Sequence, residues 1–331
     1  MNPKTFAGIE LKHFGSYIPS DVITNDDIMV KMESKCDGSL LYRTVGSKEK
    51  RVARESEMGS DMMTKVAKRI LKEANVTAKD IDKLICSCDP QDQAAPDAAV
   101  ITQAKVGLSC PSFGVSMSCS AWLCGVLIGC GFMNNGDKKI LVLAASTVGS
   151  KYFFRTPVHR AIFGDGAGGV LLEKTGANSN ILSLELLTDG NFYKEIFAPH
   201  PWTAVPEEIP AQYKNAFYMS PDNHVFFDAI DNWILPFYRR QYDNAQVSSS
   251  DISLFIIHQA SMPIFNYTLK SLKIPEAKVA GSFDRYGNTV SAELPIMIDE
   301  VIRTQRVRKG DLVYLLTYGA GFTAGAMILR I

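Results

Sequence analysis

Hydrophobic and polar positions recur along the chain with two alternating periods, and these periods predict helices and buried strands in turn. Amphipathic helix patterns cover residues 61–74 and 228–242, strand patterns cover 81–88, 138–146, 252–258, 311–318 and 325–331, and an unbroken apolar segment covers 120–133. Helical and extended segments that follow one another in this way are typical of an α/β protein. The strands read as nearly continuous apolar runs, which favours sheets that are buried on both faces.

Two short stretches recur in the same order in the second half of the chain. "KDIDKLICSC" resembles "SDISLFIIHQ" at an offset of 171 residues, and "GDKKILVLAAS" resembles "GDLVYLLTYGA" at an offset of 174. One such match can arise by chance, but two matches in one order at nearly one offset favour a duplicated half. The polar, turn-rich segment Glu173–Asn180 is the expected join, so we predict halves of residues 1–176 and 177–331.

Composition narrows the class of protein. The 331 residues are 46% hydrophobic, and 35 basic residues balance 35 acidic ones without a long Lys/Arg run, so nucleic acid is not an expected partner. The amino terminus has no apolar segment of signal-peptide length, and no run approaches the roughly 18 residues that a membrane span needs. We therefore expect a cytoplasmic protein that does not bind membranes.

The seven cysteines contain no CxxC pair, so neither a disulfide framework nor a four-thiolate zinc site is expected. In "SMSCSAWLCG", Cys119 follows a strand-like stretch and precedes the long apolar segment. A cysteine in the first turn of a helix meets the positive end of the helix dipole, which stabilises a thiolate. Cys119 is therefore a candidate nucleophile, with a small core residue as the alternative. Cys124, Cys86 and Cys88 are expected to fill the core.

Further stretches carry candidate functional residues. His258 ends the apolar strand "FIIHQ", where the alternative is a hydrogen-bonded core histidine. Asn288 lies in "YGNTVSAELP", at a turn before a predicted helix, and such turns are common without any function. "YGAGFTAGA" offers small residues that let backbone amides approach a ligand. The glycine-rich "FGDGAGG" precedes a strand, whereas a phosphate cradle needs a helix there, so we expect a tight turn packed against another backbone.

Taken in order, these stretches resemble the β-ketoacyl-acyl carrier protein synthase III family of the thiolase superfamily. The resemblance covers nearly the full chain, from "GSYIPSDVITNDDI" through "YRTVGSKEKRVA", "SCSAW", "FGDGAGG", "HQAS" and "YGNTVSAELP" to "GAGFTAGAMILRI". It implies a thiolase-like α/β fold, internally duplicated, in five α-β-α-β-α layers. The apolar segment after Cys119 and the helix after Asn288 match the two central helices of that fold.

The resemblance also implies an acyltransferase in fatty-acid, polyketide or other natural-product biosynthesis, with Cys119, His258 and Asn288 as its catalytic triad. Cys119 would accept an acyl group from a thioester, and a malonyl-type thioester would lose carbon dioxide and attack that group. His258 and Asn288 would donate to the enolate oxygen, while the backbone amides of Cys119 and Ala320 would hold the tetrahedral oxyanion. The implied partners are acyl carrier protein or acyl-coenzyme A and a second copy of the chain, with no metal and no cofactor.

Several positions depart from the family pattern. Ser261 stands where the family reads the Asn of HQAN, and Pro263 stands where it places a basic residue. The tryptophan that stacks on coenzyme A has no counterpart, although Arg43 matches a family arginine. Ala95 stands where many members place a bulky side chain that limits the acyl group. We predict that Arg43, Ser261 and Ala95 bind substrate, and that the acyl donor is larger than acetyl and rides on a carrier protein; the alternative is that other residues close the pocket.

Two other functions stay open at this point. The same acyl-cysteine could pass its acyl group to a hydroxyl or an amine without decarboxylation, and nothing in the triad excludes this. The chain could also be a non-catalytic subunit of a heteromeric condensing complex. A subunit without chemistry has no physical need for Cys119, His258 and Asn288 together, so the complete triad argues against that second alternative.

Overall fold

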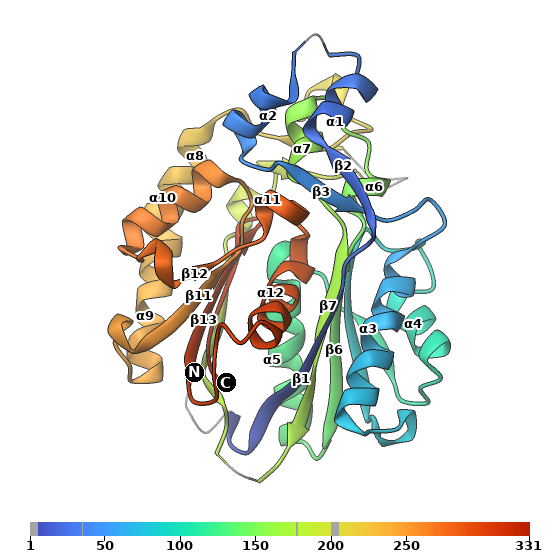
Figure 1. Ribbon diagram of the computed structural model, residues 1–331, viewed down its shortest axis with the longest axis vertical. Coiled ribbons are helices and arrows are strands. Elements are labelled where there is room, and N and C mark those ends of the chain that lie inside the picture. Colours follow the sequence, from blue (N-terminus) through green and yellow to red (C-terminus); the bar gives the residue numbers. More distant parts are fainter. Residues whose placement is uncertain (1–5, 35, 177, 200–204) are drawn as a thin grey trace.

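Two five-stranded sheets frame the protein in a computed structural model that describes residues 6–34, 36–176, 178–199 and 205–331 (Figure 1). The first sheet has the order β1-β7-β6-β4-β5 and the second has the order β8-β14-β13-β11-β12. Their strands are β1 (Ile9–Tyr17), β4 (Lys83–Asp89), β5 (Ser112–Gly114), β6 (Lys139–Ser146), β7 (Gly166–Lys174), β8 (Ile181–Thr188), β11 (Ile252–Ile257), β12 (Val279–Ala280), β13 (Leu312–Gly319) and β14 (Thr323–Arg330).

The two sheets share one topology. Counted in chain order within each sheet, the strands lie in the order 1-5-4-2-3 in both. In the first sheet β4 runs parallel to β5 and β6, and β7 runs antiparallel to β6 and β1. In the second sheet β11 likewise runs parallel to β12 and β13, and β14 runs antiparallel to β13 and β8. The internal duplication expected from the sequence is therefore confirmed. The boundary between residues 176 and 177 falls in the connection from β7 to β8 and stays a prediction, because one hydrophobic core joins the two halves.

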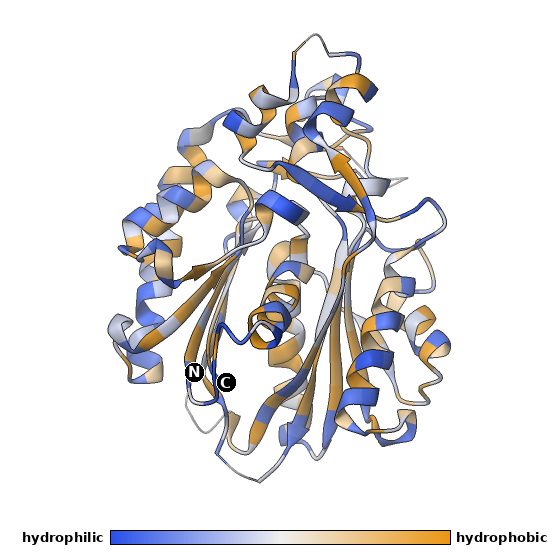
Figure 2. Cartoon of the chain, viewed as in Figure 1, coloured by the Kyte–Doolittle hydropathy of each residue, from blue (hydrophilic) through white to orange (hydrophobic). Residues whose placement is uncertain are grey.

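Helices complete five layers around these sheets, as expected (Figure 1). The outer face of the first sheet carries α3 (Gly59–Ala74) and α4 (Ala98–Val106), and that of the second carries α9 (Leu235–Ala245) and α10 (Met262–Leu272). Between the sheets lie α5 (Ala121–Asn134) and α12 (Glu293–Arg303). Figure 2 shows apolar residues concentrated on the sheets and on α5, whereas the outer helices alternate between apolar and polar residues.

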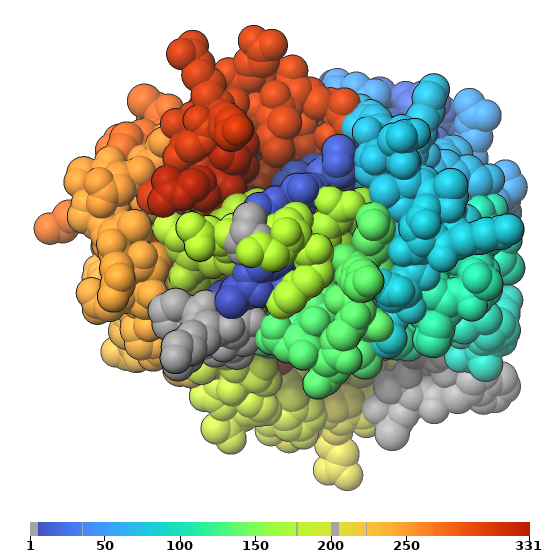
Figure 3. Space-filling view, turned by 90° about the horizontal axis from the view of Figure 1, so that it is seen from below, coloured from blue at the N-terminus to red at the C-terminus, as the bar shows by residue number. Residues whose placement is uncertain are grey.

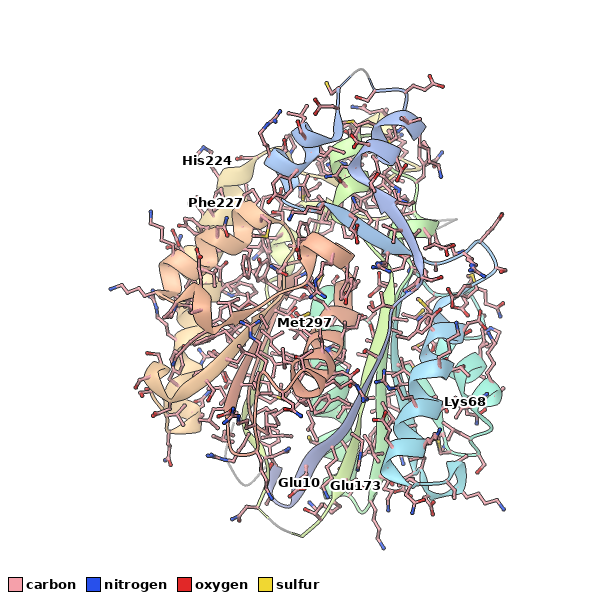
Figure 4. All side chains as sticks on the ribbon, in the orientation of Figure 1. Glu10, Lys68, Glu173, His224, Phe227 and Met297 are labelled. Atoms are coloured by element: carbon pink, nitrogen blue, oxygen red, sulfur yellow. The ribbon has the colours of Figure 1, made fainter. Side chains whose placement is uncertain are left out.

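The central layer is apolar because sheets cover it on two sides. Trp122 and Val126 of α5 and Leu294 of α12 are no more than 2% exposed. Burying a side chain of this size stabilises the fold by about 1.5–3 kcal/mol. Met297 of α12 lies between the two sheets, whereas Lys68 of α3 points outward (Figure 4).

One face of α5 is only partly buried, although the apolar segment 120–133 has no polar face and Cys124 was expected to fill the core. Cys124, Leu127, Ile128 and Phe132 recur along one side of the helix and are only partly buried. Beside them lies β5, a short strand at the edge of the first sheet, whose Phe113 ring centroid is 5.9 Å from that of Phe132. Lys83 Nζ also lies 4.8 Å from the centroid of the Phe132 ring, and the described residues cover the rest of this face only in part.

The predicted helix over 228–242 is longer than expected and contains a wider turn. It comprises α8 (Asn223–Ala229), a π-helical stretch (Ile230–Ile234) and α9. Pro236 lies in the first turn of α9 and has no N–H to donate to the carbonyl of the preceding turn, which accounts for the local change in hydrogen bonding.

Shorter elements gather at the end of the sheets where β4, β6, β11 and β13 finish (Figure 1). They are β2 (Asp21–Thr24), α1 (Asn25–Lys31), α2 (Gly38–Val45), β3 (Glu49–Val52), α6 (Val148–Lys151), α7 (Pro157–Ile162), β9 (Ile196–Phe197), β10 (Tyr218–Met219) and α11 (Phe283–Tyr286). The central helices α5 and α12 both begin at this end, which makes it the place where residues before the two helices can meet.

At the opposite end, the amino-terminal segment lies beside the connection from β7 to β8 (Figure 3). Lys174 Nζ donates to the carbonyl of Ala7 at 2.8 Å, and the amide of Thr175 donates to the carbonyl of Gly8 at 2.9 Å. Within the described ranges, no helix is long and apolar enough to cross a bilayer.

Candidate active site

Cys119 lies in a single 3-10 turn, Ser118–Ser120, immediately before α5. Ser118 has a φ of 48°, a strained value for a residue with a side chain. Thr317 Oγ1 donates to the carbonyl of Cys119 at 3.0 Å. A Cβ added to Gly319 would lie 2.9 Å from the Cys119 nitrogen, so the end of β13 can approach the cysteine only because residue 319 is glycine. These contacts fix the position of the sulfur.

His258 directly follows β11, and its amide donates to the carbonyl of Leu316 at 2.8 Å. Its side chain is fully buried and packs at a steep angle against the ring of Tyr318. Nδ1 lies 2.6 Å from Oε2 of Glu293, the first residue of α12, which is itself 1% exposed. The carboxylate of Glu293 also accepts from the amide of Gln259 at 3.1 Å. The carboxylate thus holds the imidazole from one side.

The charge of His258 follows from these neighbours. Burial by itself lowers the pKa of His258, because a charged ring is poorly solvated in the interior. The negative charges of Cys119 and Glu293 outweigh this effect and raise the pKa to about 10. The raised pKa favours the imidazolium form of the ring, which can form an ion pair with a thiolate at Cys119 and can donate to a substrate oxygen.

Asn288 is held by three backbone contacts. Its amide donates to the carbonyl of Ile162 at 2.8 Å, and its carbonyl accepts from the amide of Gly164 at 3.1 Å. Its side-chain Oδ1 accepts from the amide of Val290 at 2.7 Å, and the described residues offer no acceptor to Nδ2, the donor of the side chain. Val290 has a φ of 52°, a strained value for a β-branched residue, and backbone strain of this kind clusters at functional sites.

The glycine-rich turn "FGDGAGG" lies against the loop that carries Asn288. A Cβ added to Gly164 would lie 1.8 Å from the carbonyl oxygen of Tyr286, so only glycine fits there. Asp165 accepts from the amide of Ala53 at 2.8 Å and ties the same turn to the chain after β3. The prediction of a tight turn packed against another backbone, and not a phosphate cradle, is confirmed.

A cavity of about 160 Å³ opens between these elements. Cys119, Asn288 and Ala320 all line it, whereas His258 lies behind its wall. Most of the remaining wall is apolar and is formed by Val148, Ile162, Phe163, Ile196, Phe217, Met219, Phe226, Ile230, Ile234, Ile264 and Phe322. The π-helical stretch contributes to this wall, because Phe226, Ile230 and Ile234 recur every four residues.

The three predicted substrate-binding residues lie in different places. Ser261 precedes α10 and lines the cavity. Arg43 is exposed on α2, where its Nη1 donates to Ser39 Oγ at 2.9 Å. Ala95 is exposed in the loop before α4 and does not line the cavity within this chain. Binding roles for Arg43 and Ala95 therefore stay predictions.

The sequence interpretation missed two carboxylates. Glu293 was not predicted as the partner of His258, although it lies in the quoted stretch "YGNTVSAELP". An acidic residue that begins an otherwise apolar central helix must be paired when buried, and that was the available signal. Asp89, which also lines the cavity, ends a strand predicted only as core.

The paired sheets, the two central helices, and a cysteine, a histidine and an asparagine at one cavity together define a thiolase-like condensing enzyme. The family profile described as 3-Oxoacyl-[acyl-carrier-protein] synthase III matches residues 113–190, and the profile of its C-terminal part matches residues 242–331. The β-ketoacyl-[acyl-carrier-protein] synthase III of Caldanaerobacter subterraneus subsp. tengcongensis is 30% identical, with 96% of each chain covered.

The protein of the same name from Xanthomonas axonopodis pv. citri is 32% identical, again with 96% of each chain covered. The crystal structure of 3-oxoacyl-[acyl-carrier-protein] synthase III from Aquifex aeolicus superposes with a TM-score of 0.87 at 28% identity, covering 98% of this chain and 100% of that one. The chain belongs to the 3-oxoacyl-[acyl-carrier-protein] synthase III family and is an acyltransferase.

Replacing Glu293 by glutamine tests the proposed charge of His258. The substitution Glu293→Gln keeps the size of the side chain but removes one negative neighbour, so the pKa of His258 falls. The proton shared by His258 and Cys119 then moves toward the sulfur, so the thiolate–imidazolium form becomes less populated relative to the thiol–imidazole form. We expect iodoacetamide to alkylate Cys119 up to about tenfold more slowly at neutral pH, because one pKa unit changes the ratio of these two forms tenfold. Peptide mass spectrometry reports the rate at Cys119 separately from the exposed Cys36.

The matched control is Glu300→Gln, which removes a carboxylate from the same helix that pairs with Arg285 outside the cavity. This variant should alkylate like the unmodified protein. An unchanged rate in Glu293→Gln would show that the carboxylate does not support the thiolate.

Proposed function

We propose that the protein catalyses a decarboxylative Claisen condensation between an acyl group on Cys119 and a malonyl-type thioester. The observation that carries this proposal is the convergence of Cys119, the Asn288 side chain and the backbone at Ala320 on one apolar cavity, with His258, paired to Glu293, buried behind its wall. The family relationship supports the same chemistry, since the named relatives are β-ketoacyl-[acyl-carrier-protein] synthases.

In the first half-reaction the Cys119 thiolate attacks the carbonyl carbon of an acyl thioester. The new carbon–sulfur bond forms while the old one breaks, and the departing thiolate takes a proton from His258. The oxygen carries negative charge in the tetrahedral intermediate, and the backbone amides of Cys119 and Ala320 are the donors we assign to it. The product is an acyl-cysteine in a mostly apolar cavity.

In the second half-reaction the bond between the carboxylate carbon and the methylene carbon of the malonyl thioester breaks. Carbon dioxide leaves, and the electron pair delocalises onto the thioester oxygen as an enolate. His258, which has taken up a proton from solvent after the first half-reaction, and Asn288 Nδ2 donate to that oxygen. The methylene carbon then attacks the acyl carbonyl, and Cys119 leaves as a thiolate, ready for another cycle. Removing one such donor typically lowers the rate by about 10²–10³-fold.

The cavity favours an acyl group larger than acetyl. A cavity needs roughly 10–15 Å³ to hold one water molecule, so about 160 Å³ exceeds what a two-carbon group would fill. We propose acyl carrier protein as the principal carrier of the acyl group. Acyl-coenzyme A is less favoured, because this chain lacks the tryptophan that stacks on coenzyme A in other family members. The reaction needs no cofactor besides its thioesters, and we propose that it takes place in the cytoplasm in fatty-acid or polyketide biosynthesis.

A second candidate is transfer of the acyl group from Cys119 to a hydroxyl or amine acceptor without loss of carbon dioxide. The pairing of His258 with Glu293 favours it, because a carboxylate-held imidazole can also take a proton from an acceptor once the thiolate is acylated. Condensation remains the leading proposal, since Asn288 has no role in simple transfer.

We also propose that the protein is a homodimer in which a second copy covers the half-buried face of α5 and the edge strand β5. The apolar side chains Cys124, Leu127, Ile128 and Phe132 form a continuous strip there, and unpaired edge strands readily pair with another chain. Ala95 lies in the loop between β4 and α4, and Asp97 of this loop lies beside Gly114 at the end of β5, so a partner on this face would approach the region that contains Ala95.

The substitution Ile128→Asp tests the dimer. A charge in an apolar interface is costly unless it is paired, so we expect sedimentation velocity to show a monomer where the unmodified protein shows a dimer. Val30→Asp is the matched control, because Val30 is 80% exposed on α1 and lies away from this face. Circular dichroism checks that both variants fold; a folded Ile128→Asp variant that stays dimeric would place the interface elsewhere.

The substitution Asn288→Ala separates the two half-reactions. Because Asn288 serves only the enolate, we expect the variant to acquire an acyl group on Cys119 at a rate within about tenfold of the unmodified protein, while release of carbon dioxide falls about 10²–10³-fold. Intact-mass spectrometry across a panel of acyl-carrier and acyl-coenzyme A thioesters reads the first step, and Cys119→Ala shows that the adduct is at that residue. Equal loss of both steps would argue against this role of Asn288.

The same panel of thioesters tests the size of the acyl group. Efficient labelling of Cys119 by acetyl-coenzyme A alone would exclude a larger acyl donor.

A further inference from the structure

Asp89 is a carboxylate that the proposed condensation does not use. It is the last residue of β4 and lines the same cavity as Cys119. Among the described residues that line this cavity, it is the only acidic one. Its backbone carbonyl accepts from the amide of Thr147 at 2.8 Å, so the strand end is fixed and the side chain does not need to hold it.

The side chain of Asp89 has little to pair with inside the protein. The described residues supply one hydrogen bond to it, from Ser291 Oγ to Oδ2 at 3.5 Å, which is at the limit of a useful distance. Ser291 is itself engaged with Ser87, at an Oγ–Oγ distance of 2.9 Å. No basic side chain of the described chain forms an ion pair with Asp89. Burial raises the pKa of Asp89 to about 6, a shift that Ser291 only partly opposes.

A poorly paired carboxylate on an apolar cavity wall is costly, because its charge and its acceptor oxygens keep only part of their contact with water, and Asp89 is only partly exposed. This unfavourable free energy becomes smaller when a bound ligand donates a hydrogen bond to the carboxylate. Asp89 forms no ion pair or hydrogen bond with Cys119, His258 or Asn288, so it is not a further member of the triad. Its position on the cavity wall places it against the bound acyl group.

We propose that Asp89 makes the cavity selective for acyl groups that carry a hydrogen-bond donor, a hydroxyl or an amino group, along the chain away from the thioester. This inference rests on the proposed formation of an acyl-cysteine at Cys119. The apolar wall from Phe226 to Ile234 and the aromatic side chains around it would contact the hydrocarbon part of the chain. Tyr152 also lines the cavity, and burial together with the charge of Asp89 raises its pKa to about 12. Tyr152 therefore stays a neutral phenol beside the carboxylate.

The test compares acylation of Cys119 by matched thioesters. A plain octanoyl thioester is set against octanoyl thioesters that carry one hydroxyl or one amino group moved along the chain. Intact-mass spectrometry gives the rate of each at equal concentration. We expect the best donor-bearing thioester to acylate the unmodified protein about tenfold to a hundredfold faster than the plain one, as a site built around a buried polar group rejects an analogue that lacks the partner.

Two variants of Asp89 make the test specific. Asp89→Leu replaces the carboxylate by an apolar side chain of similar size, so the preference should disappear while the plain thioester reacts at least as fast as before. Asp89→Asn keeps an acceptor oxygen without the charge, so a preference for the hydroxyl should survive in part and a preference for the amino group should fall. Asp284→Asn, which removes an exposed carboxylate beside Arg285, is the control and should behave like the unmodified protein.

Each outcome decides between the two proposals. If Cys119 is acylated without any preference for a donor, or if both Asp89 variants keep the full preference, the inference about Asp89 is wrong and the proposed function stands. If no thioester of the series, plain or substituted, acylates Cys119, the proposed function and this inference fail together.

Discussion

The confinement of two helices between two sheets is the constraint on which the site depends. Because α5 and α12 lie side by side in one apolar layer and begin at the same end, the residues just before each helix are brought together. Cys119 precedes α5, and Asn288 and Glu293 precede or begin α12. The strands on either side finish at the same end, so His258 after β11 and Ala320 after β13 reach the same place. Duplication of one topology produces this convergence of residues far apart in the sequence.

Electrostatics then distinguishes two carboxylates in this otherwise apolar region, the buried Glu293 and the half-buried Asp89. Glu293 is paired with an imidazole at 2.6 Å, so its charge is compensated and serves to keep His258 protonated. Asp89 faces the cavity with one long hydrogen bond, so its charge has no compensation within the described chain. The first carboxylate acts on the protein's own nucleophile, and the second is available to the substrate.

Much of the fold could be predicted from the sequence, because hydrophobic period reports local structure directly. The helix over 61–74, the strands and the duplicated order were confirmed, and Cys119 lies at a helix start as the pattern indicated. The wider turn before Pro236 was not predicted, since a π-helical stretch leaves the hydrophobic pattern nearly unchanged. The half-buried face of α5 was also missed, because apolar residues read the same whether the chain itself or a second copy covers them.

The site was only partly predictable, for a different reason. Motif order located the cysteine, the histidine and the asparagine, but the partner of His258 depends on a side-chain contact across 35 positions, from residue 258 to residue 293, that no local period encodes. In the sequence Asp89 is simply the residue that follows a predicted core strand. The cavity that it lines is formed by residues from distant parts of the chain, so the local pattern does not reveal it. Arg43 and Ala95 lie outside the cavity of a single chain, so their predicted roles depend on how carrier and second copy approach.

The central claim is that Cys119 holds the acyl group while a malonyl thioester loses carbon dioxide and forms a carbon–carbon bond. Its most direct test loads the purified protein with one acyl group, removes the donor, and adds a malonyl thioester carrying a label in its free carboxyl group. We predict one labelled carbon dioxide released for each acyl group lost from Cys119, and a 3-oxoacyl product that contains both fragments. Loss of the acyl group without release of labelled carbon dioxide would contradict the account.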